Sequence, residues 1–123
     1  MRRILAVDDD SDILDILQFI LEDSGYKVDT LSDGNKLMDT ISRNNPDLIL
    51  LDVMLGNIDG RDLCKQLKKD DHTHGIPVVM ISASHNAGNT INQENGPNDF
   101  VAKPFDINVL LDTIKKQLNL KAA

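Results

Sequence analysis

Short apolar runs alternate with longer amphipathic stretches along the 123-residue chain. This alternation is typical of repeated strand–helix units that build a parallel sheet. Runs that are almost wholly apolar are expected where helices cover both faces of such a sheet. The predicted strands are Ile4–Val7, Val28–Leu31, Leu48–Leu51, Val78–Ile81 and Phe100–Ala102.

Apolar residues spaced three and four positions apart predict helices between and after these strands. A glycine is a common helix stop, and an aspartate is a good N-terminal cap. The predicted helices run from about Ile13 to Gly25, from about Asn35 to Ser42, from Asp59-Gly60 through Leu67, and from Asp106 through Leu118.

The segment Asn86–Asn95 occupies the place of a further helix but has a weak helical pattern. It contains Gly88 and several asparagines, with only Ala87 and Ile91 as apolar anchors. Glycine costs roughly 1 kcal/mol relative to alanine inside a helix. We expect this segment to be short, frayed or mobile.

Composition and charge narrow the kinds of protein that this chain can be. With 41% hydrophobic and 27% charged residues it is an ordinary globular sequence, long enough for one compact domain, residues 1–123. The net charge of -7 argues against direct nucleic-acid binding, which needs clustered Lys and Arg. The apolar run after Met1 is too short for a signal peptide or a membrane span, and the single cysteine, Cys64, cannot form an internal disulfide. We therefore expect a cytoplasmic protein with no membrane association.

Chemically useful side chains directly follow four of the predicted strands. In an open parallel sheet, ligands bind beyond the carboxyl ends of the strands. Crowded carboxylates raise one another's pKa unless a cation joins them, and such an oxygen-rich site suits Mg²⁺. A carboxylate can act as a nucleophile toward phosphorus while a metal and a lysine offset charge on the phosphoryl oxygens. The residues at these strand ends are Asp8, Asp9 and Asp10, then Asp52, Ser82 and Lys103.

Each of these residues also has a purely structural interpretation. Acids favour the positive end of a helix, which explains one or two of Asp8–Asp10 but not three. Asp52 could be a turn residue, Ser82 a strand-end hydroxyl and Lys103 a surface lysine. Their order and their placement at strand ends together favour a shared site.

Four motifs in the same order resemble those of the response-regulator receiver family of two-component signalling, and the resemblance covers essentially the whole chain. They include an acidic pair after the first strand, a phosphoacceptor segment, a switch hydroxyl and a lysine-proline signature. The matching segments are Ile4–Asp10, Asp47–Leu55 followed by Asp59-Gly60, Pro77–Ala83, and Phe100–Phe105.

The resemblance implies a flavodoxin-like α/β fold, with a five-stranded parallel sheet in the order 2-1-3-4-5, two helices on one face and three on the other. It implies that Asp52 accepts a phosphoryl group from a sensor histidine kinase or a histidine phosphotransfer protein. The protein would then be a phosphoacceptor switch rather than an enzyme, beyond its own phosphoryl transfer and autodephosphorylation. Phosphorylation would change the surface of helix 4, strand 5 and helix 5, where a downstream protein binds and receivers commonly form homodimers. The sequence fits a stand-alone receiver and the receiver of a longer regulator equally well.

The resemblance also assigns roles to individual residues. Asp9, Asp52 and the Met54 backbone carbonyl would hold Mg²⁺ or Mn²⁺, and Asp8 would contact the metal through water. Ser82 and Lys103 would bind the phosphoryl oxygens, and Phe100 would move inward when Ser82 shifts. The Lys103-Pro104 peptide is expected to be cis.

The chain departs from the family pattern at three places. Gly56 stands where the family usually has proline, so we expect a less rigid loop after Asp52. Gly96–Asp99 reads differently from the usual glycine-alanine-aspartate run, and Asn86–Asn95 is a weak helix.

Met54 and Ser84 flank the expected path of attacking water; Met54 cannot orient it, which predicts slow to moderate dephosphorylation.

Other functions fit the residues less well. A phosphatase or dehalogenase-like hydrolase needs a second acid where Met54 stands, and a flavodoxin cradle would not place three aspartates next to a phosphate. A calcium loop beginning at Asp8 would need glycine at Ile13 and an acid at Phe19. The strongest rival is a receiver-shaped scaffold that binds partners without phosphorylation.

His72 and His74 are expected in a solvated loop rather than a zinc site, and Cys64 is expected to be a small buried hydrophobe.

Overall fold

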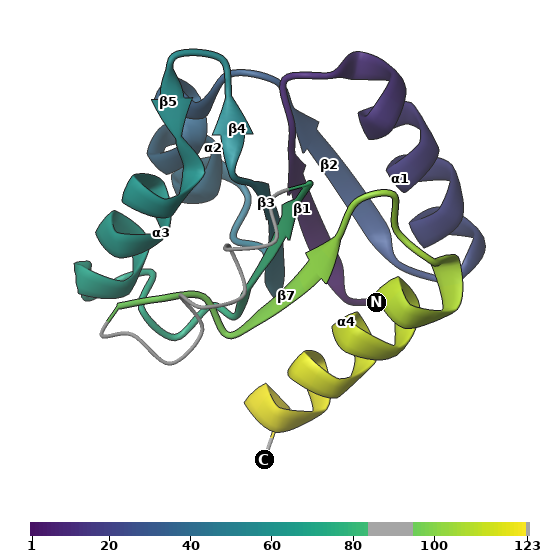
Figure 1. Ribbon diagram of the computed structural model, residues 1–123. Helices are drawn as coiled ribbons and strands as arrows, with labels where there is room; N and C mark the ends of the chain where they lie inside the picture. Colours follow the sequence, from purple (N-terminus) through teal and green to yellow (C-terminus); the bar gives the residue numbers. More distant parts are fainter. Residues whose placement is uncertain (84–94, 123) are drawn as a thin grey trace.

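The computed structural model describes residues 1–83 and 95–122, the last two by backbone alone. Five parallel strands form one sheet, β2-β1-β3-β6-β7, as Figure 1 shows. This is the predicted 2-1-3-4-5 order, because β4 and β5 form a separate short hairpin. The sheet strands are β1 (Arg3–Val7), β2 (Lys27–Leu31), β3 (Leu48–Asp52), β6 (Val78–Ser82) and β7 (Asp99–Ala102).

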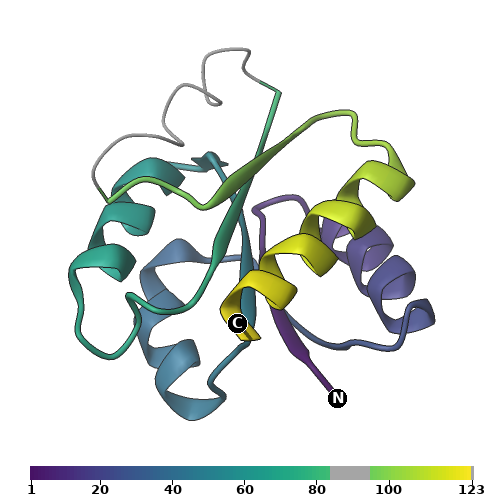
Figure 2. The ribbon, with the colours of Figure 1, turned by 90° about the horizontal axis from the view of Figure 1, so that it is seen from below.

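Helices cover both faces of the sheet (Figures 1 and 2). The helices α1 and α4 pack on one face, and α2 and α3 pack on the other. A 3-10 turn, η1 (Gly34–Lys36), precedes α2. The helices are α1 (Ser11–Asp23), α2 (Leu37–Arg43), α3 (Gly60–Lys69) and α4 (Ile107–Ala122).

The core consists of two aliphatic layers, one on each side of the sheet. On one side, alternate residues of β3 such as Ile49 and Leu51 contact Leu37 of α2 and Leu67 of α3. On the other side, Leu48 and Leu50 belong to the layer completed by α1 and α4. The side chains of β3 are therefore buried on both faces, as a central strand of a parallel sheet requires.

The predicted helix boundaries agree with the structure where it can be compared. Helix α1 ends just before Gly25, and the Asp106 carboxylate accepts the amides of Asn108 and Val109 at the start of α4. The weak helix predicted at Asn86–Asn95, and with it the third helix of the second face, lies outside the described residues apart from Asn95. No helix among the described residues has the length and apolar character needed to cross a membrane.

The short antiparallel pairing of β4 (Met54–Leu55) with β5 (Ile58–Asp59) was not predicted. Two residues, Gly56 and Asn57, connect the strands, and Gly56 has φ of 64°. A two-residue hairpin turn favours glycine at a first position with positive φ. Gly56 thus serves the turn itself, which a proline with its fixed negative φ could not do in this conformation.

Candidate functional site

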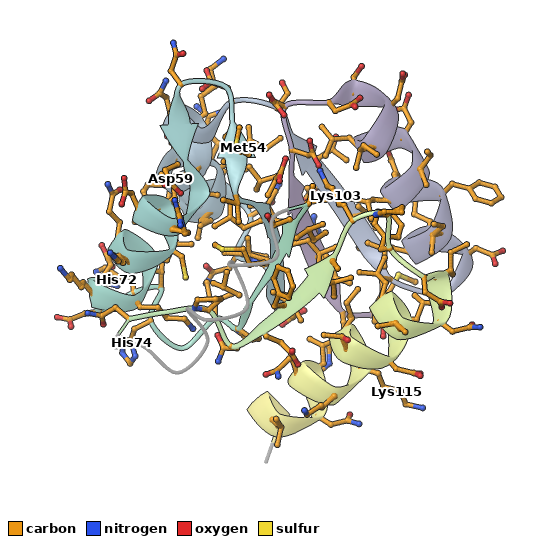
Figure 3. All side chains as sticks on the ribbon, viewed as in Figure 1. Met54, Asp59, His72, His74, Lys103 and Lys115 are labelled. Carbon is orange, nitrogen blue, oxygen red and sulfur yellow. The ribbon has the colours of Figure 1, made fainter. Side chains whose placement is uncertain are left out.

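The site lies at the carboxyl edge of the sheet. Asp8 and Asp9 follow β1, Asp52 is the last residue of β3, and Lys103 follows β7. Parallel pairing of β1, β3 and β6 aligns their carboxyl ends, so residues far apart in sequence meet there. Figure 3 shows Met54 and Lys103 on this side of the molecule.

Asp8, Asp9 and Asp52 form an acidic cluster in which one oxygen of each carboxylate lies within 4.8 Å of the others. Asp8 and Asp52 are buried, with 1% and 5% of their surface exposed, whereas Asp9 is open to solvent. The Gly56 amide donates a hydrogen bond of 3.2 Å to Asp9 Oδ2, which links the hairpin to the cluster. The cluster is thus buried on one side and accessible on the other.

Lys103 supplies a positive charge to the two buried acids. Its Nζ donates to Asp8 Oδ2 at 2.9 Å and to Asp52 Oδ2 at 3.3 Å. Burial alone would lower the pKa of Lys103, but its hydrogen bonds and charge pairing with Asp8 and Asp52 outweigh burial and raise it. Lys103 therefore stays protonated at neutral pH and bridges β1 and β3.

One lysine does not neutralise this cluster. Burial, followed by the negative charge of Asp8, raises the pKa of Asp52 from 3.8 to about 6, against the opposing effect of Lys103. A carboxylate with a raised pKa beside like charges is an arrangement that a bound cation stabilises. The cluster therefore fits a hard divalent cation such as Mg²⁺, which prefers carboxylate and carbonyl oxygens and water.

The three consecutive aspartates, Asp8, Asp9 and Asp10, make different contacts. Asp10 Oδ1 accepts the amides of Asp12 at 2.9 Å and Ile13 at 3.4 Å, so it caps α1. Asp8 Oδ1 accepts the Asp10 amide at 2.9 Å while its other oxygen meets Lys103. The helix-cap interpretation thus holds for Asp10, and Asp8 and Asp9 are left for the cluster.

The remaining predicted site residues surround this cluster at different depths. Ser82 ends β6 and is 2% exposed, and its carbonyl accepts the Lys103 amide at 2.9 Å. Phe100 lies in β7 opposite Met80 and packs against the layer formed with α2 and α3. The Met54 amide donates to Asp52 Oδ1 at 3.3 Å while its side chain is 70% exposed. The Lys103-Pro104 peptide is cis, as predicted.

Two backbone contributions to the site were not predicted from the sequence. The Gly56 amide bond to Asp9 depends on the β4–β5 hairpin, which is too short to show a strand pattern. Gly60 begins α3 directly against the Asp52–Val53 backbone. A glycine in the first turn of a predicted helix, where it weakens the helix, was the available signal.

The other polar residues considered from the sequence lie away from this edge. His72 and His74 are exposed in the turn after α3 (Figure 3). Cys64 is buried in α3, as predicted, and burial raises the pKa of its thiol to about 11.

Comparison with known proteins agrees with this geometry. The sequence matches the response regulator receiver domain family over residues 4–115. A putative response regulator from Chloroflexus aurantiacus is 34% identical, with 96% of this chain and 98% of that chain covered and a TM-score of 0.87. A CheY-like receiver domain protein from Methanospirillum hungatei is 28% identical, with coverages of 99% and 97% and a TM-score of 0.89.

A larger protein also contains this fold. NtrX from Brucella abortus is 32% identical with a TM-score of 0.87, and the match covers 99% of this chain but 28% of that one. The strand-end residues, the sheet order and the family match lead to one assignment. The chain belongs to the receiver domain family of two-component response regulators.

Proposed function

We propose that this receiver accepts a phosphoryl group on Asp52, from a phosphohistidine of a sensor histidine kinase or a histidine phosphotransfer protein. The single observation that carries the proposal is the buried Asp52 carboxylate, which accepts a hydrogen bond from Lys103 Nζ and lies beside Asp8 and Asp9 at the open edge of the sheet. A structural ion pair would need one acid for one lysine, but here Lys103 contacts two buried carboxylates, Asp8 and Asp52, and Asp9 lies in the same acidic cluster.

The chemistry follows from the positions of these side chains. An Asp52 oxygen attacks phosphorus, the phosphorus–nitrogen bond breaks, and the donor imidazole leaves with the bonding electron pair. Lys103 Nζ, already beside Asp52, can hold an oxygen of the transferring group, and the Ser82 hydroxyl can bind the product. Asp9, Asp52 and the Met54 carbonyl would hold Mg²⁺ or Mn²⁺, with Asp8 acting through water. When bound, the metal would offset negative charge on the phosphoryl oxygens.

The proposal also covers how phosphorylation of Asp52 would be transmitted to the surface of the domain. Phosphorylation would draw Ser82 toward the new phosphoryl group and Phe100 inward, and would thereby alter the surface around β7 and α4. A downstream protein, or a second copy of the chain, would read that surface. We propose that the domain acts in the cytoplasm and does not itself bind nucleic acid.

Intact-protein mass spectrometry after incubation with acetyl phosphate tests the proposal. The wild type is expected to gain one phosphoryl group when Mg²⁺ is present and none when the metal is chelated. Asp52→Asn is expected to gain none, because the amide is not a competent nucleophile. Asp10→Asn is the matched control. It makes the same chemical change at the aspartate that follows Asp9, outside the cluster, and asparagine is also a good helix cap.

The opposite results are equally informative. A wild type that gains no phosphoryl group under any condition would favour the phosphorylation-independent scaffold. A gain that persists in Asp52→Asn would place the acceptor elsewhere.

A further inference from the structure

Gly60, the first residue of α3, contacts the backbone of the proposed phosphoacceptor. Its amide donates a hydrogen bond of 2.7 Å to the Val53 carbonyl. A Cβ atom on residue 60 would overlap the Asp52 carbonyl oxygen and lie only 3.0 Å from the Asp52 carbonyl carbon and 3.1 Å from Val53 Cα. All three are backbone atoms, so no side-chain rotation could relieve the overlap.

Neither side of this contact is free to withdraw. The strand β3 is paired with β1 and β6 and is buried along its whole length. The helix α3 is held by the buried side chains of Leu63, Cys64 and Leu67. A side chain at position 60 would therefore displace the segment between the two, residues 53–59.

This segment is a closed loop whose two ends meet at the Gly60 contact. Within it, the Met54 amide bonds to Asp52 Oδ1 and the Gly56 amide bonds to Asp9 Oδ2. It also carries the Met54 carbonyl, which the proposed function assigns to the metal. Displacement at the base of the loop would thus move contacts to two of the three acids.

We propose that Gly60 is a positioning residue for the phosphoacceptor site. The absence of a side chain lets α3 close the base of loop 53–59, and this closure holds Asp52, Asp9 and the Met54 carbonyl in one arrangement. The inference rests on the proposed function, because it concerns the same metal and phosphoryl site.

Three variants separate this role from a general effect on stability. Gly60→Ala introduces the overlap. Gly75→Ala makes the same chemical change where an added Cβ meets nothing within 4 Å. Leu67→Val trims a buried side chain that holds α3 in the core, and so loosens the packing of the helix outside loop 53–59 and without crowding Asp52. For each full-length variant we would measure urea unfolding, the dissociation constant for Mg²⁺ by titration calorimetry, and the phosphorylation rate with acetyl phosphate.

Gly60→Ala is expected to bind Mg²⁺ about tenfold more weakly, the scale seen when groups that orient metal ligands are lost. Its phosphorylation should slow at the same Mg²⁺ concentration, while Gly75→Ala matches the wild type and Leu67→Val loses stability alone. If Gly60→Ala unfolds in buffer, the measurements are repeated for all variants in an osmolyte that restores its folding.

Wild-type Mg²⁺ affinity and phosphorylation in folded Gly60→Ala would overturn the inference and leave the proposed function intact. Equal losses of Mg²⁺ affinity in Leu67→Val and Gly60→Ala would also overturn it, because loosening of α3 would then be sufficient. A wild type that binds Mg²⁺ but is never phosphorylated would refute the proposed function, while weaker Mg²⁺ binding in Gly60→Ala would still support the positioning role.

Discussion

At the scale of single residues, Met54 is expected to control how long the phosphoryl group persists. Its amide donates to Asp52 Oδ1, but the residue is 70% exposed and its thioether is at best a weak hydrogen-bond acceptor. An asparagine there could orient an attacking water molecule. We expect Met54→Asn to speed autodephosphorylation roughly fivefold, which corresponds to one net hydrogen bond of about 1 kcal/mol.

Decay of the phosphorylated protein after removal of acetyl phosphate, followed by mass spectrometry, measures this effect. Met54→Leu keeps the size and apolar character of the side chain and is expected to decay like the wild type. An unchanged or slower decay in Met54→Asn would contradict the assigned role of this position.

For the three aspartates after β1, the sequence predicts their position but not all of their contacts. Their place after an apolar run predicts an acidic edge, and the structure has one. Which of them caps the helix and which pairs with the lysine could not be predicted, because these contacts depend on the helix that begins at Ser11 and on a lysine distant in sequence. Asp10 caps α1, Asp8 meets Lys103, and Asp9 faces solvent and the Gly56 amide.

At the scale of elements, the central strands were predictable because β1, β3 and β6 are compact apolar runs bounded by polar residues. The hairpin β4–β5 was not, because two-residue strands show no periodicity and their pairing depends on the Gly56-Asn57 turn. The missed hairpin affects the site, since it carries the backbone amides that bond to Asp52 and Asp9.

An apolar groove between α1 and the start of α4 is expected to receive the phosphohistidine-bearing partner. It has a volume of about 500 Å³, and its lining includes Ile13, Ile16 and Ile20 of α1 together with Ile107 and Lys103. Ile16 and Ile107 are 49% and 50% exposed, which is unusual for aliphatic side chains gathered in one place. Because Lys103 lines the groove and also bonds to Asp52, a partner seated there would lie next to the phosphoacceptor.

Ile16→Glu tests this expectation with two phosphoryl donors. Transfer from a phosphorylated histidine phosphotransfer domain should slow about tenfold, as for loss of an interface side chain worth about 1.4 kcal/mol. Phosphorylation by acetyl phosphate should not change, because this small donor needs no docking surface. Leu120→Glu, a similar change at the other end of α4, is the control. Equal slowing with both donors would point to damage at the site instead of lost docking.

At the scale of the whole molecule, the order of the sheet brings the site together. Lys103 and Asp8 are 95 positions apart, yet they form a 2.9 Å ion pair because β1 and β7 end at the same edge. Family resemblance and strand-end placement predicted this convergence. Burial was not predictable, because only the packed structure shows that Asp8 and Asp52 lie under the surface while Asp9 does not. The raised pKa of Asp52 follows from that burial.

Global stability should therefore depend on pH through Asp52. In the metal-free protein its folded-state pKa is about 6, above the usual value of 3.8, so between these pH values the folded state holds a proton that the unfolded state has released. Since the unfolded state binds fewer protons in this range, the contribution of Asp52 to the free energy of unfolding falls as pH rises from about 4 to 6 and stays low above it. The loss is of order 1–3 kcal/mol, at about 1.4 kcal/mol per pKa unit. Asp52→Asn carries no such charge, so its stability relative to the wild type should increase over this range and then level off.

Urea unfolding followed by circular dichroism at pH values from about 4 to 8 would measure both proteins without divalent metal. Comparing the two cancels the pH dependence of carboxylates that do not interact with Asp52, such as Asp59, whose pKa is lowered by its hydrogen bond with Arg61. Adding Mg²⁺ at neutral pH should then reduce the difference in stability between Asp52→Asn and the wild type. A cation that binds the folded wild type, present at ten times its dissociation constant, adds about 1.4 kcal/mol to the free energy of unfolding. If the difference in free energy of unfolding between the wild type and Asp52→Asn does not change with pH, the pKa of Asp52 is not raised in the folded protein. If Mg²⁺ leaves that difference unchanged, the acidic cluster does not hold the metal.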